Sequence, residues 1–273
     1  MTDIFTTFTS FFLLVITLFL SLFGITLYLN GFDDIDFESV ESISFSSEIV
    51  LSNIHSGKGK TLQGGCTDGE YAYICSADTK NNKCVITKYN IETWEEVAKS
   101  KAVKVDHGND IAYNKDKDCL VVCHNSPNRT LVSLVDKETL EVTETIEIPL
   151  EIYSITYNEI KNKYAVGISY THDFAILDKN FNVVETIQGA KPESKTKQGM
   201  DSDSKYIYFL LSTPNAISVY DWKGNHYGVF KLNDEAKKFE GEHIFLHNDD
   251  LYIGYNSDKG KIYKSTFEVT YKE

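Results

Sequence analysis

Short apolar runs and polar turns alternate along most of this chain, and together they recur with a nearly constant period. In each repeat an apolar run ends at an Asp or Asn, a short turn follows, and a second, valine-rich run comes next. The acidic or amide marker falls at Asn90, Asp136, Asp178 and Asp221, which gives spacings of 46, 42 and 43 residues. A fifth, less regular copy lies around residues 261–264.

The first half of each unit repeats as well, because a polar turn precedes a run of β-branched and aromatic residues in every copy. Each unit therefore holds about four short runs of strand-forming residues, and no stretch of helical periodicity is long enough to compete. We interpret the unit as a four-stranded antiparallel meander. A period of roughly 40–50 residues with four strands per unit is typical of a β-propeller, in which neighbouring blades bury each other's faces.

Residues 58–273 accommodate five such units. The sequence thus predicts an all-β fold, a five-bladed β-propeller of four-stranded antiparallel blades. The fifth unit is incomplete, and residues 33–57 supply one good strand, near residues 47–51. We expect this strand to complete the fifth blade and close the ring, which would remove exposed sheet edges.

The N-terminal segment has a different pattern, because residues 4–32 contain no charged side chain and are rich in Phe, Leu, Ile and Thr. This run is long enough to cross a bilayer and longer than the apolar part of an ordinary cleavable signal. We therefore predict one N-terminal transmembrane helix within residues 1–32 that stays attached as an anchor. The alternative is a cleaved signal peptide, which would give a secreted protein.

The segment that follows, residues 33–57, is acidic in its first half, and we expect a solvated stalk that lifts the propeller off the membrane. Lys58 is the first basic residue, so the positive-inside rule gives little information about the orientation of the predicted helix. We expect a single-pass membrane protein whose propeller lies outside the cytoplasm.

The net charge of the chain argues against some classes of binding partner. A formal net charge of -13 argues against binding to nucleic acid or to an anionic membrane surface, since both require a surface patch of basic residues. No phosphate-binding loop, dinucleotide motif or Ser-His-Asp spacing is present, so we expect no cofactor and assign no catalytic residue. The expected partners are the membrane, through the N-terminal helix, and a small molecule, peptide, glycan or protein.

Five cysteines lie in the first two units, and the odd number leaves at least one thiol free. Cys75 and Cys84 flank a predicted hairpin. They are either a disulfide, which an extracytoplasmic location would allow, or small buried apolar residues. No Cys-x-x-Cys spacing is present, so we expect no zinc site, and we assign no metal ligand. An alternative is that a metal or a shared proton is held by His107, Asp110, Glu242 and His243.

The candidate site lies just before, or at the start of, the first strand of each unit, where polar residues gather. The innermost strands of a propeller converge on its axis, so these positions form a ring at one mouth of the central channel. The ring can hold a ligand, or it can be a crowded wall whose side chains hydrogen-bond to one another and to water. Its members are Gln63, His107, Asn109, Asp110, Tyr153, Gln198, Glu242 and His243.

This arrangement resembles the plant and bacterial type of glutaminyl-peptide cyclotransferase, which is also a five-bladed propeller. Gln63-Gly64 is similar to the Gln-Gly that opens the first blade of that family, and Glu240-Gly241 is similar to the Glu-Gly that opens its other blades. In the next strand the family carries Tyr-Glu-Ser, whereas this chain has Tyr73-Ile74-Cys75-Ser76. The resemblance implies the same fold and covers about four fifths of the chain.

Together these patterns favour an anchored, extracytoplasmic propeller that works as a ligand-binding or protein-interaction module at the cell envelope. One alternative is an enzyme that acts on a peptide or glycan, similar to glutaminyl cyclase, with Glu242 or His107 as acid or base. Another is a structural scaffold whose partners dock on the rim.

Overall fold

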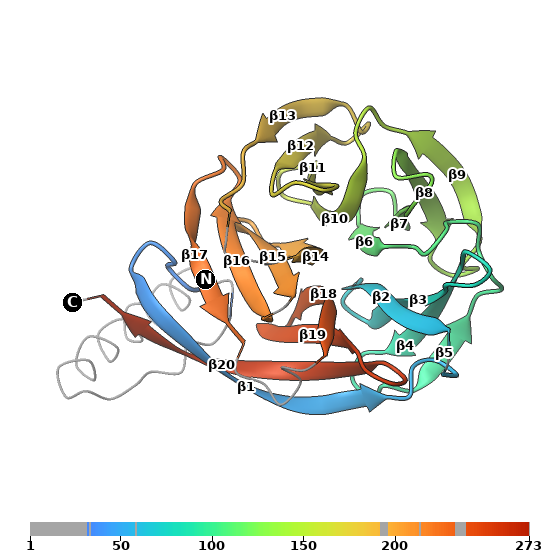
Figure 1. The fold of residues 1–273 in the computed structure, drawn as a ribbon, viewed down its shortest axis with the longest axis horizontal. Helices are drawn as coiled ribbons and strands as arrows, with labels where there is room; N and C mark the ends of the chain where they lie inside the picture. The colour runs from blue at the N-terminus through green and yellow to red at the C-terminus, as the bar shows by residue number, and fades with distance from the viewer. Residues whose placement is uncertain are drawn as a thin grey trace, which may run out of the picture.

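The polar turns of the sequence separate β-strands throughout the computed structural model, which describes residues 32, 34–57, 59–191, 196–212, 214–232 and 239–272. These residues form twenty strands arranged in five four-stranded antiparallel sheets around a central axis (Figure 1). The predicted five-bladed β-propeller is therefore confirmed.

Each of the first four blades is a simple meander of consecutive strands. Blade one contains β2 (Lys60–Thr67), β3 (Tyr71–Asp78), β4 (Lys83–Asn90) and β5 (Glu96–Lys99). Blade two contains β6 (Asp110–Asn114), β7 (Cys119–Cys123), β8 (Leu131–Asp136) and β9 (Val142–Glu147). Blade three contains β10 (Ile152–Asn158), β11 (Lys163–Ile168), β12 (Phe174–Asp178) and β13 (Val183–Ile187). Blade four contains β14 (Thr196–Ser202), β15 (Tyr206–Ser212), β16 (Ala216–Asp221) and β17 (His226–Lys231).

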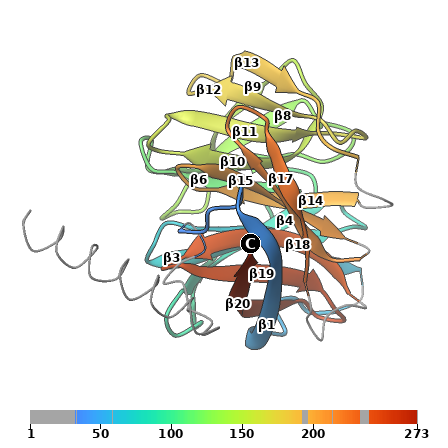
Figure 2. The ribbon, with the colours of Figure 1, turned by 90° about the vertical axis from the view of Figure 1, so that its left-hand side faces the viewer.

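The fifth blade joins the two ends of the propeller. It contains β18 (Glu240–His247), β19 (Asp250–Asn256) and β20 (Lys261–Tyr271), with β1 (Val40–Ser52) as its outer strand. β1 runs antiparallel to β20, from Val40 opposite Tyr271 to Ser52 opposite Lys261, and the two strands lie side by side in Figures 1 and 2. The expected ring-closing strand is confirmed, and it is longer than the five residues that the sequence indicated.

The core lies between neighbouring blades rather than inside one of them. Every residue of β15 is buried, whereas the outer strand β9 is exposed along most of its length. Residues from β7 and β8 pack with residues from β11 and β12 in one cluster. Burial thus increases from the rim toward the axis, as expected when each sheet buries both faces against its neighbours.

Residues 34–39 do not form the solvated stalk that the sequence predicted. Phe32, Ile35 and Phe37 are buried in a cluster with residues of β15, β17 and β19, and the ring centroid of Phe37 lies 4.9 Å from that of Tyr206. The acidic residues of this stretch face solvent, and the apolar residues between them face the propeller. The segment therefore covers blades four and five.

The predicted transmembrane helix lies outside the described residues, apart from Phe32 at its end. Within the part of the chain that the structure describes, no helix has the length and apolar character needed to cross a bilayer.

All five cysteines are free thiols, so the Cys75–Cys84 disulfide is not present. Cys75 lies opposite Ile86 and Cys84 lies opposite Ala77, which makes the two cysteines diagonal neighbours across the β3–β4 hairpin. Both are fully buried in the apolar cluster between blades one and two.

We expect Phe37→Ala to lower the free energy of unfolding by about 3–5 kcal/mol, because it leaves a cavity under the segment that leads into β1. Ile49→Ala is the control, since Ile49 lies in the following strand β1 and is 46% exposed, and its effect should stay below about 1 kcal/mol. Urea unfolding of the two variants measures both values. Equal losses would show that residues 34–39 contribute nothing to the fold.

Candidate functional site

The five innermost strands line the central channel in a closed ring. β2 contacts β6, and the contacts continue through β10, β14 and β18 back to β2. All five strands run in the same direction along the axis, so they start at one mouth and end at the other. We call these the strand-start mouth and the strand-end mouth.

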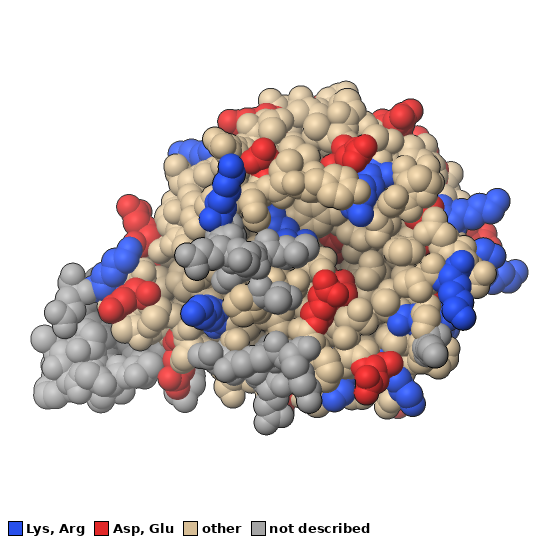
Figure 3. Space-filling view, viewed as in Figure 1, with Lys and Arg blue, Asp and Glu red and all other residues tan. Residues whose placement is uncertain are grey.

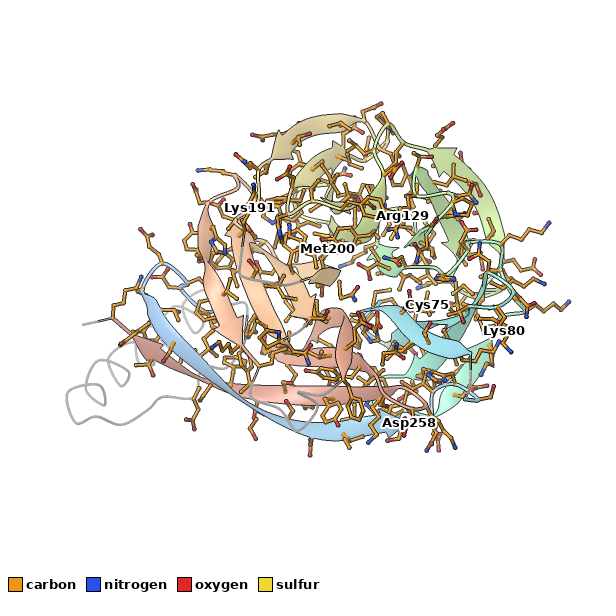
Figure 4. The ribbon with its side chains drawn as sticks, viewed as in Figure 1. Cys75, Lys80, Arg129, Lys191, Met200 and Asp258 are labelled. Carbon is orange, nitrogen blue, oxygen red and sulfur yellow. The ribbon has the colours of Figure 1, made fainter. Side chains whose placement is uncertain are left out.

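Asp110 lies deep in the channel wall and links three blades. Its carboxylate accepts hydrogen bonds from the backbone N–H groups of Ile111 at 3.0 Å, Ile155 at 3.0 Å and Met200 at 3.2 Å. Burial raises the pKa of Asp110 well above its usual range, and the three N–H donors oppose this rise. Figure 4 shows Met200 near the centre of the ring. Asp110 therefore holds the inner strands together.

His243 is the second buried member of the predicted ring. Burial lowers the pKa of His243 to about 4, so the ring is neutral at pH 7 and its Nδ1–H donates to the carbonyl oxygen of Gln63. A Cβ atom on Gly254 would lie 2.1 Å from Cε1 of His243, and one on Gly65 would lie 2.6 Å from Cδ2. Glycine at these positions is what allows the imidazole to fit between strands.

Three other predicted residues lie nearer the strand-start mouth. Gln63 Nε2 donates to Oε2 of Glu242 at 3.4 Å, and Gln198 Nε2 donates to Oε1 of Glu240 at 2.7 Å. Burial raises the pKa of Glu242 well above its usual range, and the neighbouring Glu240 adds to the effect. These amide–carboxyl pairs connect blades one, four and five.

A second polar network connects blades two and three at the same mouth. Asn109 Nδ2 donates to the carbonyl oxygen of Tyr153 at 2.6 Å, and Asn125 Nδ2 donates to Oδ1 of Asn109 at 2.8 Å. Asn125 also lies 3.2 Å from Nδ1 of His107. Burial lowers the pKa of His107, so this imidazole is neutral at pH 7.

A cavity of about 360 Å³ opens at the strand-start mouth beside this network. Three of the eight predicted residues, Asn109, Tyr153 and Gln198, line it. The other five predicted residues are not part of its wall. The rest of the wall consists of residues that the sequence did not single out, namely Arg129, Ser169, Tyr170, Thr171, His172 and Lys197.

These additional residues come mainly from the loops after β7 and β11. Both strands run antiparallel to the inner strands, so they end at the strand-start mouth and their loops extend over it. Figure 4 shows Arg129 near the end of β7. One signal was available in the sequence, because Arg129 is the only arginine of the chain.

The side chain of Arg129 is held without a carboxylate partner. Its Nη1 donates to Oγ of Ser169 at 3.2 Å, and its guanidinium carbon lies 5.2 Å from the ring centroid of Tyr170. Its Nε is buried and has no hydrogen-bond partner among the described residues. The hydrogen bond to Ser169 thus positions the guanidinium at the cavity wall, and Tyr170 lies beside it.

Lys197 is a second cation of this wall and is only 5% exposed. Its Nζ donates to the carbonyl oxygen of His172 and lies 4.3 Å from the ring centroid of Phe209. Burial lowers the pKa of Lys197 to about 7, and Asp173 only partly offsets this effect. In the described part of the chain no carboxylate lies within 4.0 Å of Lys197 or Arg129.

The strand-end mouth has the opposite character. A cavity of about 460 Å³ opens there, and its wall includes Asp68, Glu159, Asp201 and Asp203. Asp201 accepts the backbone N–H of Leu246 at 2.8 Å, and burial raises the pKa of Asp201 to about 6. Across the described ranges, no three His, Cys, Asp or Glu side chains are grouped to hold a metal ion.

The basic residues of the surface are dispersed. Figure 3 shows one face of the ring, hollowed near its centre, with Lys and Arg side chains separated around it. The two cations of the strand-start cavity are therefore a local feature in a chain of net charge -13.

Comparison with family models and with curated proteins finds no match. Among solved structures, glutaminyl cyclase from Myxococcus xanthus superimposes with a TM-score of 0.64 at 11% identity, covering 84% of this chain and 100% of that one. Virginiamycin B lyase from Staphylococcus aureus, in a catalytically inactive form with quinupristin, gives a TM-score of 0.46 at 13% identity, covering 75% of this chain and 66% of that one. The first likeness supports the propeller fold and the weak resemblance to glutaminyl cyclase, at the level of fold alone.

We expect Lys197→Met to raise the free energy of unfolding near neutral pH by about 1–3 kcal/mol, the usual range for a buried polar group that lacks full compensation. The pKa of Lys197 is about 7 in the folded protein and about 10.4 in the unfolded chain, so the unfolded chain binds more protons between these values. The parent protein is therefore stabilised as the pH rises from 7 to 10, and the advantage of the variant is largest below pH 7 and disappears toward pH 10.

Thermal unfolding at pH 6, 7.5 and 9 measures this difference, at roughly 2–4 °C per kcal/mol. Lys191→Met is the matched control, because Lys191 is exposed, and it should show no such pH dependence. A pH-independent effect of Lys197→Met would show that the buried charge is compensated in the folded protein.

Proposed function

We propose that this protein is a ligand-binding module that holds a small carboxylate-bearing molecule in the cavity at the strand-start mouth. The observation that carries the proposal is Arg129, a cation in the cavity wall beside the basic side chain of Lys197, with no carboxylate partner for either among the described residues. Cations of this kind require compensation when they are removed from water. An anionic ligand supplies it.

The geometry of Arg129 favours a carboxylate. A guanidinium presents parallel N–H groups that match the two oxygens of a carboxylate, and the Tyr170 ring lies over this one at 5.2 Å. Arg129 lines the cavity, and its only side-chain hydrogen bond among the described residues is the one to Ser169. Asn109 and Gln198 add amide groups to the wall, and a volume of about 360 Å³ suits a small molecule.

A glutaminyl cyclase activity has less support in this chain. In β3, where the similar family carries a glutamate, Ile74 and Cys75 are both fully buried in apolar clusters. No acid stands at that place, so the binding module is the function that the site supports best.

The propeller is attached to the membrane through residues 1–31 in this proposal, with its blades outside the cytoplasm. Phe32 lines the strand-end cavity, and its N–H donates to the carbonyl oxygen of Asp249 at 3.2 Å. The anchor would therefore join the propeller at the strand-end mouth. The ligand cavity at the opposite mouth would then face away from the bilayer.

Calorimetric titration with lactate and succinate, beside their uncharged amides, tests the ligand class. We expect the acids to bind at least tenfold more tightly than the amides, and Arg129→Gln to weaken acid binding by about 1.5–3 kcal/mol, the range for hydrogen bonds to charged groups. Lys191→Gln makes the same charge change at an exposed lysine and should leave the affinity within twofold. Equal binding of acids and amides, or an unaffected Arg129→Gln variant, would refute the proposal.

Membrane attachment is tested by fractionation of cells that express the full chain or residues 32–273. We expect the full chain to stay with the membrane after alkaline carbonate extraction and the shorter chain to be soluble. External protease should degrade the blades of the full chain in intact cells. A full chain found in the culture medium without its first 31 residues would instead establish a cleaved signal.

A further inference from the structure

We propose that Lys197 binds its ligand covalently, through a Schiff base between its Nζ and the carbonyl carbon of a 2-oxo acid whose carboxylate lies on Arg129. This inference rests on the proposed function, since it assumes the same cavity and the same carboxylate contact. It adds the substrate class and a reaction step.

The position of Lys197 suits a nucleophilic amine. The side chain lies in the wall of the cavity, and its Nζ lies 4.3 Å from the ring centroid of Phe209 and 5.7 Å from that of Phe174. Lys88 is buried to a similar extent, but its Nζ pairs with Glu138 at 2.8 Å. Lys197 is therefore the lysine that combines burial, a cavity and the lack of an acid partner in the described part of the chain.

The groups around Lys197 keep a large fraction of it uncharged. Asp173 is the acid that favours the ammonium form, and burial outweighs it. His172 and His226 also face this lysine, and burial lowers the pKa of both, so they are neutral at pH 7. A Schiff base requires the free amine, and desolvation of a lysine in an apolar pocket is a known way to provide it.

The cavity also offers groups for the proton transfers. The neutral amine attacks the carbonyl carbon, and one amine proton moves to the oxygen to give a carbinolamine. The carbinolamine then loses its hydroxyl group as water, with one further proton from nitrogen, and the carbon–nitrogen double bond forms. Tyr153 and His172 belong to the wall of the same cavity, and the neutral imidazole of His172 can pass these protons. No oxidant or reductant is needed.

Reductive trapping with pyruvate tests the inference. The protein is incubated with pyruvate at pH 7.5, treated with borohydride, and analysed by intact mass and peptide mapping. We expect one adduct, with the mass of pyruvic acid less one oxygen atom, at Lys197 and at least tenfold above any other lysine. Lys197→Arg, which keeps the positive charge, should abolish the adduct, and Lys191→Arg should leave it unchanged. Melting temperatures confirm that both variants are folded.

Two further arms separate this inference from the proposed function. Hydroxyacetone replaces the carboxylate of pyruvate by an uncharged group, and we expect its trapping to be at least tenfold weaker and insensitive to Arg129→Gln. If lactate and pyruvate bind by calorimetry but no adduct forms, the Schiff base is refuted and the binding function stands. If hydroxyacetone and pyruvate react equally and Arg129→Gln has no effect on either, the carboxylate contact and the 2-oxo acid are refuted.

Discussion

The pairing of β1 with β20 is the constraint on which the rest of the structure depends. Without β1 the fifth blade would have three strands and β20 would be an open edge. Because β1 is the first strand of the described residues and β20 the last, their ladder joins the two ends of the propeller. Phe32 and Phe37, the aromatic residues before β1, pack against residues of blade four as well as blade five. A closed ring in turn forces the five inner strands together at the axis.

Crowding at the axis explains why the channel contains both structural and ligand-facing polar groups. Asp110 and His243 are inaccessible, and their hydrogen bonds go to backbone groups of other blades. Nearer the mouth the ring widens, and side chains from the loops after β7 and β11 complete a cavity there. The two mouths differ in charge, since Arg129 and Lys197 line one and several aspartates line the other. A single fold thus presents two chemically distinct faces.

The sequence predicted the fold better than the site, for physical reasons. Strand-forming runs and turns are local features, so the period of the markers was enough to give five blades and even the closing strand. The polar residues at the starts of the inner strands do lie in the channel, but their depth was not predictable, because the burial of His243 depends on glycines of neighbouring strands and that of Asp110 on the backbone of other blades. Arg129 and Lys197 were not chosen, since what distinguishes them is the lack of a partner in space. Residues 33–39 were predicted to be part of a stalk because their acidic residues suggested solvent exposure. The alternating apolar residues between them were the signal of a buried face, and they were not used.

The central claim is that Arg129 contacts the carboxylate of a ligand at the strand-start mouth. Because the chain has one arginine, labelling with 15N-arginine gives a single side-chain Nε–Hε signal in a nitrogen–proton correlation spectrum. Titration with lactate should shift this signal in a saturable way and slow the exchange of its proton, while the amide of lactate leaves it in place. A signal that stays unchanged at saturating lactate would contradict the account, because a carboxylate bound on the Arg129 guanidinium must change the surroundings of its Nε–Hε group.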